Sequence, residues 1–66
     1  MPSAKNILEA FARRDKTIEV TPEAAEFLTR LKSYQVYPSI NNIVNEAKRE
    51  SVTRIDVNFL ADIGYD

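Results

Sequence analysis

The first third of the chain carries a helical pattern of apolar residues and then a strand-like one. Apolar side chains at positions 4, 7, 8 and 11 have the spacing of one helix face, which predicts a helix over residues 3–14. Ser3 is a suitable N-cap for this helix. Residues 17–21 then alternate strictly and are rich in β-branched side chains, as in a short strand with Ile18 and Val20 facing inward. So short a strand must pair with another, for which a second copy of the chain is one candidate.

The middle of the chain predicts helical structure with an interruption. Thr21-Pro22-Glu23 has the features of a helix start: a hydroxyl cap, Pro at the first position and an acid in the first turn. Two inward-facing apolar stripes follow. The first consists of Ala24, Phe27, Leu28 and Leu31. The second begins after Ser39 and consists of Ile40, Ile43, Val44 and Ala47. Pro38 separates them, so residues 22–50 form either one kinked helix or two helices. We expect two, because an interior Pro costs a helix about 3 kcal/mol.

The last part of the chain predicts a short link and a final helix. Val52 indicates a brief extended segment, and residues 53–56, Thr-Arg-Ile-Asp, fit the hydroxyl-x-x-acid box that opens a helix. Gly64 is placed to end it. The expected inner face is Val57, Leu60, Ala61 and Ile63. The whole pattern predicts one mainly α domain over residues 1–66, with three to four short helices and a short β bridge.

The composition excludes most kinds of site chemistry. The 66 residues include no Cys and no His, which removes disulfides and nearly every zinc, haem or iron–sulfur site. Gly64 is the only Gly, so no Gly-rich phosphate loop exists. The usual general base and the best side-chain nucleophile are both missing. We therefore expect no enzyme activity, no catalytic residue, no metal and no cofactor.

The length of the chain favours a homodimer. A domain of this size buries only about 60% of the surface that its unfolded chain exposes, so small domains often need disulfides, a metal or a partner subunit. With the first two excluded, a second copy remains. No apolar run approaches the roughly 20 residues of a membrane span, and the first residues lack the apolar core of a signal peptide. We expect an intracellular, cytoplasmic protein without membrane contacts.

The charges are nearly balanced but unevenly placed. The net charge is −1, whereas nucleic-acid-binding domains are typically basic. Two basic clusters nevertheless stand out, formed by Arg13, Arg14 and Lys16 and by Lys48, Arg49 and Arg54. Local clusters matter more than the total charge for steering a charged partner.

Several short segments resemble the histone fold. They are Phe11-Ala12-Arg13-Arg14 followed by Val20-Thr21, the run from Val20 to Leu28, and the run from Ala47 to Val57. The resemblance implies a DNA-binding dimer with a short helix on either side of a long central one. It also implies an ion pair between Arg49 and Asp56 and places Ser51 where the family has a Thr that touches phosphate. The chain departs from the family at Glu19 and Glu50, where archaeal histones have Arg and Lys, and at Pro38 in the central helix.

Two further families share parts of the pattern. Residues 16–50 resemble ribbon–helix–helix repressors and antitoxins, whose ribbon would be residues 16–20 and whose second helix would be residues 39–47. That resemblance implies a dimer in which outward ribbon residues (Lys16 or Thr17, Glu19, Thr21) read bases. Residues 20–60 also resemble the small C-terminal domain of the light-independent protochlorophyllide reductase B subunit, which implies only a helical protein-interaction scaffold.

The sequence thus predicts a small dimeric DNA-binding protein, architectural or transcription-regulating, that contacts the DNA backbone. The candidate DNA-binding residues are Arg13, Arg14, Lys16, Thr17, Thr21, Lys48, Arg49, Ser51, Thr53 and Arg54. The candidate core or dimer residues are Phe11, Ile18, Val20, Phe27, Leu28, Leu31, Ile43, Val44, Phe59 and Leu60. The alternative is a helical protein-interaction module with no nucleic-acid role, which the net charge, Glu19 and Glu50 favour.

Overall fold

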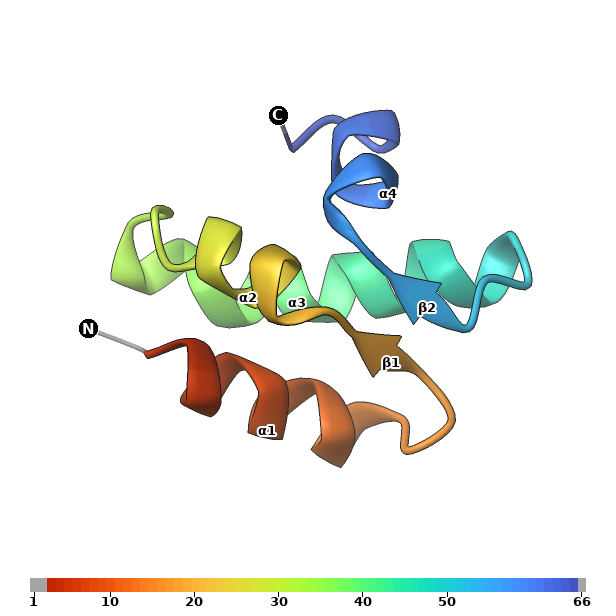
Figure 1. Cartoon of the computed structure of the whole chain (residues 1–66), viewed down its shortest axis with the longest axis horizontal. Coiled ribbons are helices and arrows are strands. Elements are labelled where there is room, and N and C mark those ends of the chain that lie inside the picture. Colours follow the sequence, from red (N-terminus) through yellow and green to blue (C-terminus); the bar gives the residue numbers. More distant parts are fainter. Residues whose placement is uncertain (1–2, 66) are drawn as a thin grey trace.

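The computed structural model describes residues 3–65 as two successive helix–strand–helix units (Figure 1). The elements are α1 (Ala4–Arg14), β1 (Glu19–Val20), α2 (Pro22–Leu28), α3 (Ser33–Arg49), β2 (Arg54–Ile55) and α4 (Val57–Asp62). In Figure 1, α1 lies below the strands, α4 lies above them, and α3 spans the molecule behind α2. The predicted mainly α class with a short β bridge is confirmed.

The two strands pair with each other, in parallel and within the chain. Glu19 lies opposite Arg54 and Val20 opposite Ile55, and the Glu19 amide donates to the Thr53 carbonyl at 2.7 Å. The strand expected over residues 17–21 is therefore only two residues long, and its partner is the chain's own second strand. Parallel strands need a long connection, which α2 and α3 provide.

The helical middle of the chain is broken, as predicted, but at residues 29–32 and not at Pro38. Lys32 has extended backbone angles (φ −62°, ψ 142°), and α3 starts at Ser33 with Pro38 inside it. The prediction that Pro38 separates the two helices is wrong. The earlier start brings Val36 onto the buried face of α3, where it is 1% exposed. Burying such a side chain contributes about 1.5–3 kcal/mol, which offsets much of the cost of the proline.

Side chains cap three of the helices at their starts. Ser3 accepts from the Asn6 amide as predicted, and Thr21 accepts from the Ala24 amide at the start of α2. Asp56 accepts from the Phe59 amide at 2.8 Å and is itself the N-cap of α4. The capping box predicted over residues 53–56 is therefore wrong, because residues 54 and 55 form β2 and leave only the last of the four to cap a helix.

The helices and strands enclose one apolar core. Seven of the predicted core residues are buried: Phe11, Ile18, Leu28, Ile43, Val44, Phe59 and Leu60. Val20, Phe27 and Leu31 are only half-buried against it. Val57 and Ala61, both expected on the inner face of α4, are exposed. The core also contains Ile7, Ala10, Ala24, Ala25, Val36, Ile40, Ala47 and Ile55. A single copy of the chain therefore covers its own core.

Candidate nucleic-acid interface

The parallel pairing of β1 and β2 brings the two basic clusters to one end of the molecule. Each strand is preceded by a loop and by a helix that ends in two basic residues, Arg13 and Arg14 in α1 and Lys48 and Arg49 in α3. Because the strands run in the same direction in register, their two preceding loops lie side by side, as Figure 1 shows. We call this end, with its six cations, the basic end; they are Arg13, Arg14, Lys16, Lys48, Arg49 and Arg54.

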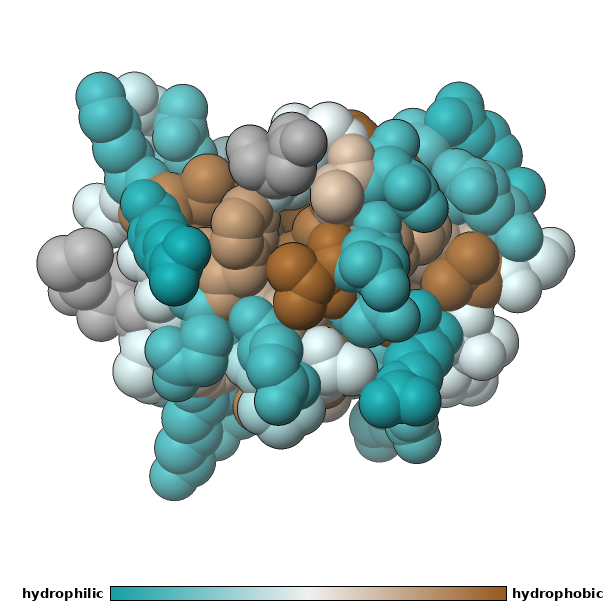
Figure 2. All heavy atoms as spheres, turned by 45° about the horizontal axis from the view of Figure 1, so that its top comes forward, coloured by the Kyte–Doolittle hydropathy of each residue, from teal (hydrophilic) through white to brown (hydrophobic). Residues whose placement is uncertain are grey.

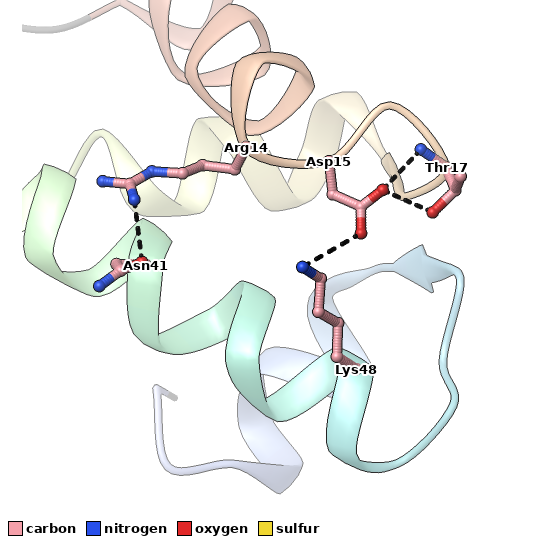
Figure 3. A network of polar contacts seen from close by, with 5 residues as sticks. All are labelled: Arg14, Asp15, Thr17, Asn41 and Lys48. Carbon is pink, nitrogen blue, oxygen red and sulfur yellow. Dashed lines mark hydrogen bonds and ion pairs between the residues drawn. The ribbon is translucent and has the colours of Figure 1, made fainter.

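Polar contacts connect the end of α1 to α3 (Figure 3). Arg14 donates from Nη1 to Oδ1 of Asn41 at 3.0 Å, and Nζ of Lys48 lies 3.6 Å from Oδ2 of Asp15. The other oxygen of Asp15 accepts from the amide and the hydroxyl of Thr17, at 2.9 and 2.6 Å. These contacts hold the first loop against the C-terminal half of α3.

The surroundings of Asp15 lower the pKa of its carboxyl group. The two hydrogen bonds from Thr17 lower the pKa of Asp15 below its ordinary value and outweigh the opposing effect of desolvation, and the charge of Lys48 makes a smaller contribution in the same direction as the hydrogen bonds. Asp15 is therefore ionised at neutral pH. Its ion pair with Lys48 is solvent-accessible, since the Lys48 side chain is 56% exposed, so the ammonium group stays accessible to a partner.

The charge of the chain is polarised toward this end. Within residues 13–19 and 46–54, six cations face four carboxylates, which gives a net charge of +2 and leaves −3 for the rest of the chain. One carboxylate, Glu46, pairs with Arg49 on the same helix. In residues 3–65 no ion pair involves Arg13, Arg14, Lys16 or Arg54. Four cations of the basic end thus keep their charge unpaired.

Nine of the ten candidate DNA-binding residues are exposed around this end, and the exception is Thr21. Thr21 is only 8% exposed and its hydroxyl accepts from the Ala24 amide, so it does not belong to the surface. The predicted ion pair between Arg49 and Asp56 is also wrong. Arg49 pairs with Glu46 one helical turn before it, while the carboxylate of Asp56 is used as the cap of α4.

Sequence reasoning did not identify Asn41 as a partner of Arg14. Asn41 and Lys48 are seven residues apart, which is two helical turns, so both lie on the flank of α3 that faces the end of α1. That spacing was the available signal. It becomes informative only when the position of α1 is known.

Three features weaken the positive potential of the basic end. Glu19 lies directly opposite Arg54 in the strand pair, and Glu50 follows Arg49 at the end of α3. The C-terminal ends of α1 and α3, which carry the negative ends of the helix dipoles, also point toward the two loops. The arrangement therefore suits a few contacts to a polyanion more than extensive neutralisation of one.

No family model, curated protein or solved structure matches this chain in the comparisons. Within residues 3–65 the structure contains no helix that is long and apolar enough to cross a membrane. The same residues contain no group of three carboxylates placed to hold a metal ion.

Proposed function

We propose that the protein binds DNA by contacting the phosphate backbone with its basic end. One observation carries the proposal: two basic clusters that are far apart in the sequence are brought together by the register of β1 and β2. The loops and helix ends that bear them are exposed. Contacts from such side chains position a protein on a duplex without reading its sequence, which suits an architectural or regulatory role. This role implies an intracellular location.

The number of unpaired cations sets the expected strength of binding. Each neutralised phosphate contributes about −0.9 to the slope of log affinity against log salt concentration. Four cations, Arg13, Arg14, Lys16 and Arg54, therefore predict a slope of about −3 to −4 for one copy, or roughly a 100-fold loss of affinity between 50 and 200 mM salt.

A titration of a fluorescently labelled DNA duplex at two salt concentrations tests the proposal. The double variant Arg13→Gln/Lys16→Gln should weaken binding and reduce the steepness of the salt dependence by about two. Its matched control is Lys5→Gln/Lys32→Gln, which removes the same charge outside the basic end. Absence of binding by the wild type at low salt would refute the proposal, and so would equal losses in the two variants.

The proposal includes a homodimer, for which the face of α2 and α4 is the expected contact. Pro22, Phe27 and Val57 line a hollow of about 380 Å³ there, with charged side chains at its edges. Figure 2 shows apolar residues exposed in the middle of the view, with hydrophilic residues between and around them. A second copy would double the phosphate contacts. Sedimentation should give a dimer that Val57→Glu dissociates; a wild-type monomer would limit the protein to one basic end.

The second candidate function is a protein-interaction module without a nucleic-acid role. Its supporting observation is the exposure of a large aromatic side chain on α3, Tyr34, which is 70% exposed. Tyr is enriched at protein interfaces, because it offers a large apolar body with a polar tip. A wild type that fails to bind duplex DNA at low salt would leave this function as the better one.

A further inference from the structure

A groove runs along one flank of α3, away from the flank that contacts the end of α1. It consists of two adjoining hollows of about 540 and 610 Å³, which share Asn42 and Tyr65. Tyr34, Pro38, Asn42 and Glu46 recur every four residues and so form one row along α3. The C-terminal segment after α4, residues 63–65, forms the opposite wall. Asn41 and Lys48, which contact α1, belong to a different flank of the same helix.

One end of this groove is apolar and aromatic. Tyr34 is 70% exposed and Pro38 is exposed as well, while Leu31 and Tyr65 are half-buried beside them. Large apolar side chains that gather in an exposed hollow mark a binding surface more often than singly scattered ones do. This end therefore suits an aromatic or large aliphatic side chain of a partner.

The other end of the groove is acidic. Its charged residues are Glu46, Arg49, Glu50 and Asp62. Arg49 pairs with Glu46, and in residues 3–65 neither Glu50 nor Asp62 has an ion-pair partner. Two uncompensated carboxylates repel a phosphate group, so this end disfavours nucleic acid and attracts a basic side chain.

We propose that this groove binds a peptide segment of a partner protein that has an aromatic or aliphatic anchor at one end and Lys or Arg at the other. The anchor contacts Tyr34 and Pro38, and the basic side chains contact Glu50 and Asp62. From Tyr34 to Glu50 the helix rises about 24 Å, which an extended segment of about seven residues spans. The acidic end of this site borders the basic end, with which it shares Arg49, but the peptide contacts use Tyr34, Glu50 and Asp62 and do not depend on DNA binding.

Selection from a random 12-residue peptide library displayed on phage tests the proposal. The wild-type protein is the bait, and Tyr34→Ala is used for counter-selection. The enriched peptides should combine an aromatic or large aliphatic residue with Lys or Arg several positions away. One enriched peptide, synthesised with a fluorescent label, then serves as the probe for anisotropy measurements. Enrichment of acidic peptides, or no enrichment over the bare support, would overturn the proposal.

The chain offers a matched control for each end of the groove. Tyr34→Ala should weaken binding of the probe at least about tenfold, whereas Tyr37→Ala, on the same helix but outside the groove, should leave it within about twofold. Glu50→Lys should weaken binding mostly at low salt, whereas Glu9→Lys on α1 should not. Circular dichroism establishes that each variant is folded.

Two other results would also overturn it. Equal binding of the probe by the wild type and Tyr34→Ala would show that it binds elsewhere. Dissociation of a wild-type dimer by Tyr34→Ala would assign the groove to a second copy instead of a peptide. Loss of DNA binding in Arg13→Gln/Lys16→Gln would not change the results expected for the peptide probe, so the two proposals can fail separately.

Discussion

Replacing Ser51 by Gly should stabilise the protein. Ser51 follows α3 with a φ of +58°, and it is the one residue other than Gly with a positive φ in residues 3–65. Its amide donates to the Lys48 carbonyl and the next amide, of Val52, to the Ala47 carbonyl at 2.8 Å, which closes the helix end in the way that favours Gly. The left-handed conformation costs a residue with a Cβ about 1–2 kcal/mol. The greater conformational freedom of Gly in the unfolded chain cancels part of this difference. The free energy of unfolding should therefore rise by about 0.5–1 kcal/mol.

Thermal unfolding followed by circular dichroism measures the effect. The entropy of unfolding of a 66-residue chain is about 0.14 kcal/mol/K, so the expected rise in Tm is about 4–7 °C. Gly64 is the matched control, because it closes α4 with a φ of +101° and has open space where a Cβ would lie. Gly64→Ala should lower Tm by a similar amount through the backbone alone. A Tm for Ser51→Gly that is equal to or below that of the wild type would refute the reasoning.

Four further substitutions test other parts of the structure. Pro38→Ala restores an amide donor inside α3 and should raise the free energy of unfolding by about 1–3 kcal/mol in urea titrations; an unchanged midpoint would contradict this. Thr21→Ala removes the cap of α2 and should lower the free energy of unfolding by about 1 kcal/mol without changing DNA affinity. A weaker DNA affinity would show that Thr21 belongs to the DNA-binding surface. Because the folded state lowers the pKa of Asp15, its contribution to stability is present above the ordinary value of 3.8 and is lost as the pH falls below it. Asp15→Asn should therefore reduce the acid dependence of the urea midpoint between about pH 5 and pH 2, and parallel curves would refute the shift. Glu19→Gln removes the carboxylate opposite Arg54 and should raise DNA affinity at low salt in anisotropy titrations; unchanged affinity would exclude Glu19 from the interface.

The parts of the fold that could be predicted are those fixed by neighbouring residues. The start of α1 at Ser3, the start of α2 at Thr21 and Pro22, and the end of α4 before Gly64 each depend on backbone groups within about one helical turn. A local signal is sufficient there, because the capping side chain and the amide that it satisfies are close in sequence.

The parts that were predicted wrongly depend on distant contacts. The cost of Pro38 is local, but the gain from extending α3 back to Ser33 comes from burying Val36 in a core that other helices complete. Thr53 was expected to cap a helix, yet its carbonyl accepts from the amide of Glu19, and β2 follows it directly. In both cases the tertiary contact outweighs the local preference, and the sequence around the residue does not reveal the contact.

The candidate DNA site combines both kinds of information. Each basic cluster follows from the sequence, but their proximity follows only from the parallel register of Glu19 with Arg54 and Val20 with Ile55. The same register that gathers six cations also places Glu19 opposite Arg54 and holds Glu50 next to Arg49. The net charge of this end is therefore only +2, and neutralising one carboxylate would raise that net charge by half. Neutralising a single acid should therefore change the salt dependence of DNA binding visibly. Neutralising any one of the cations should change the fold much less.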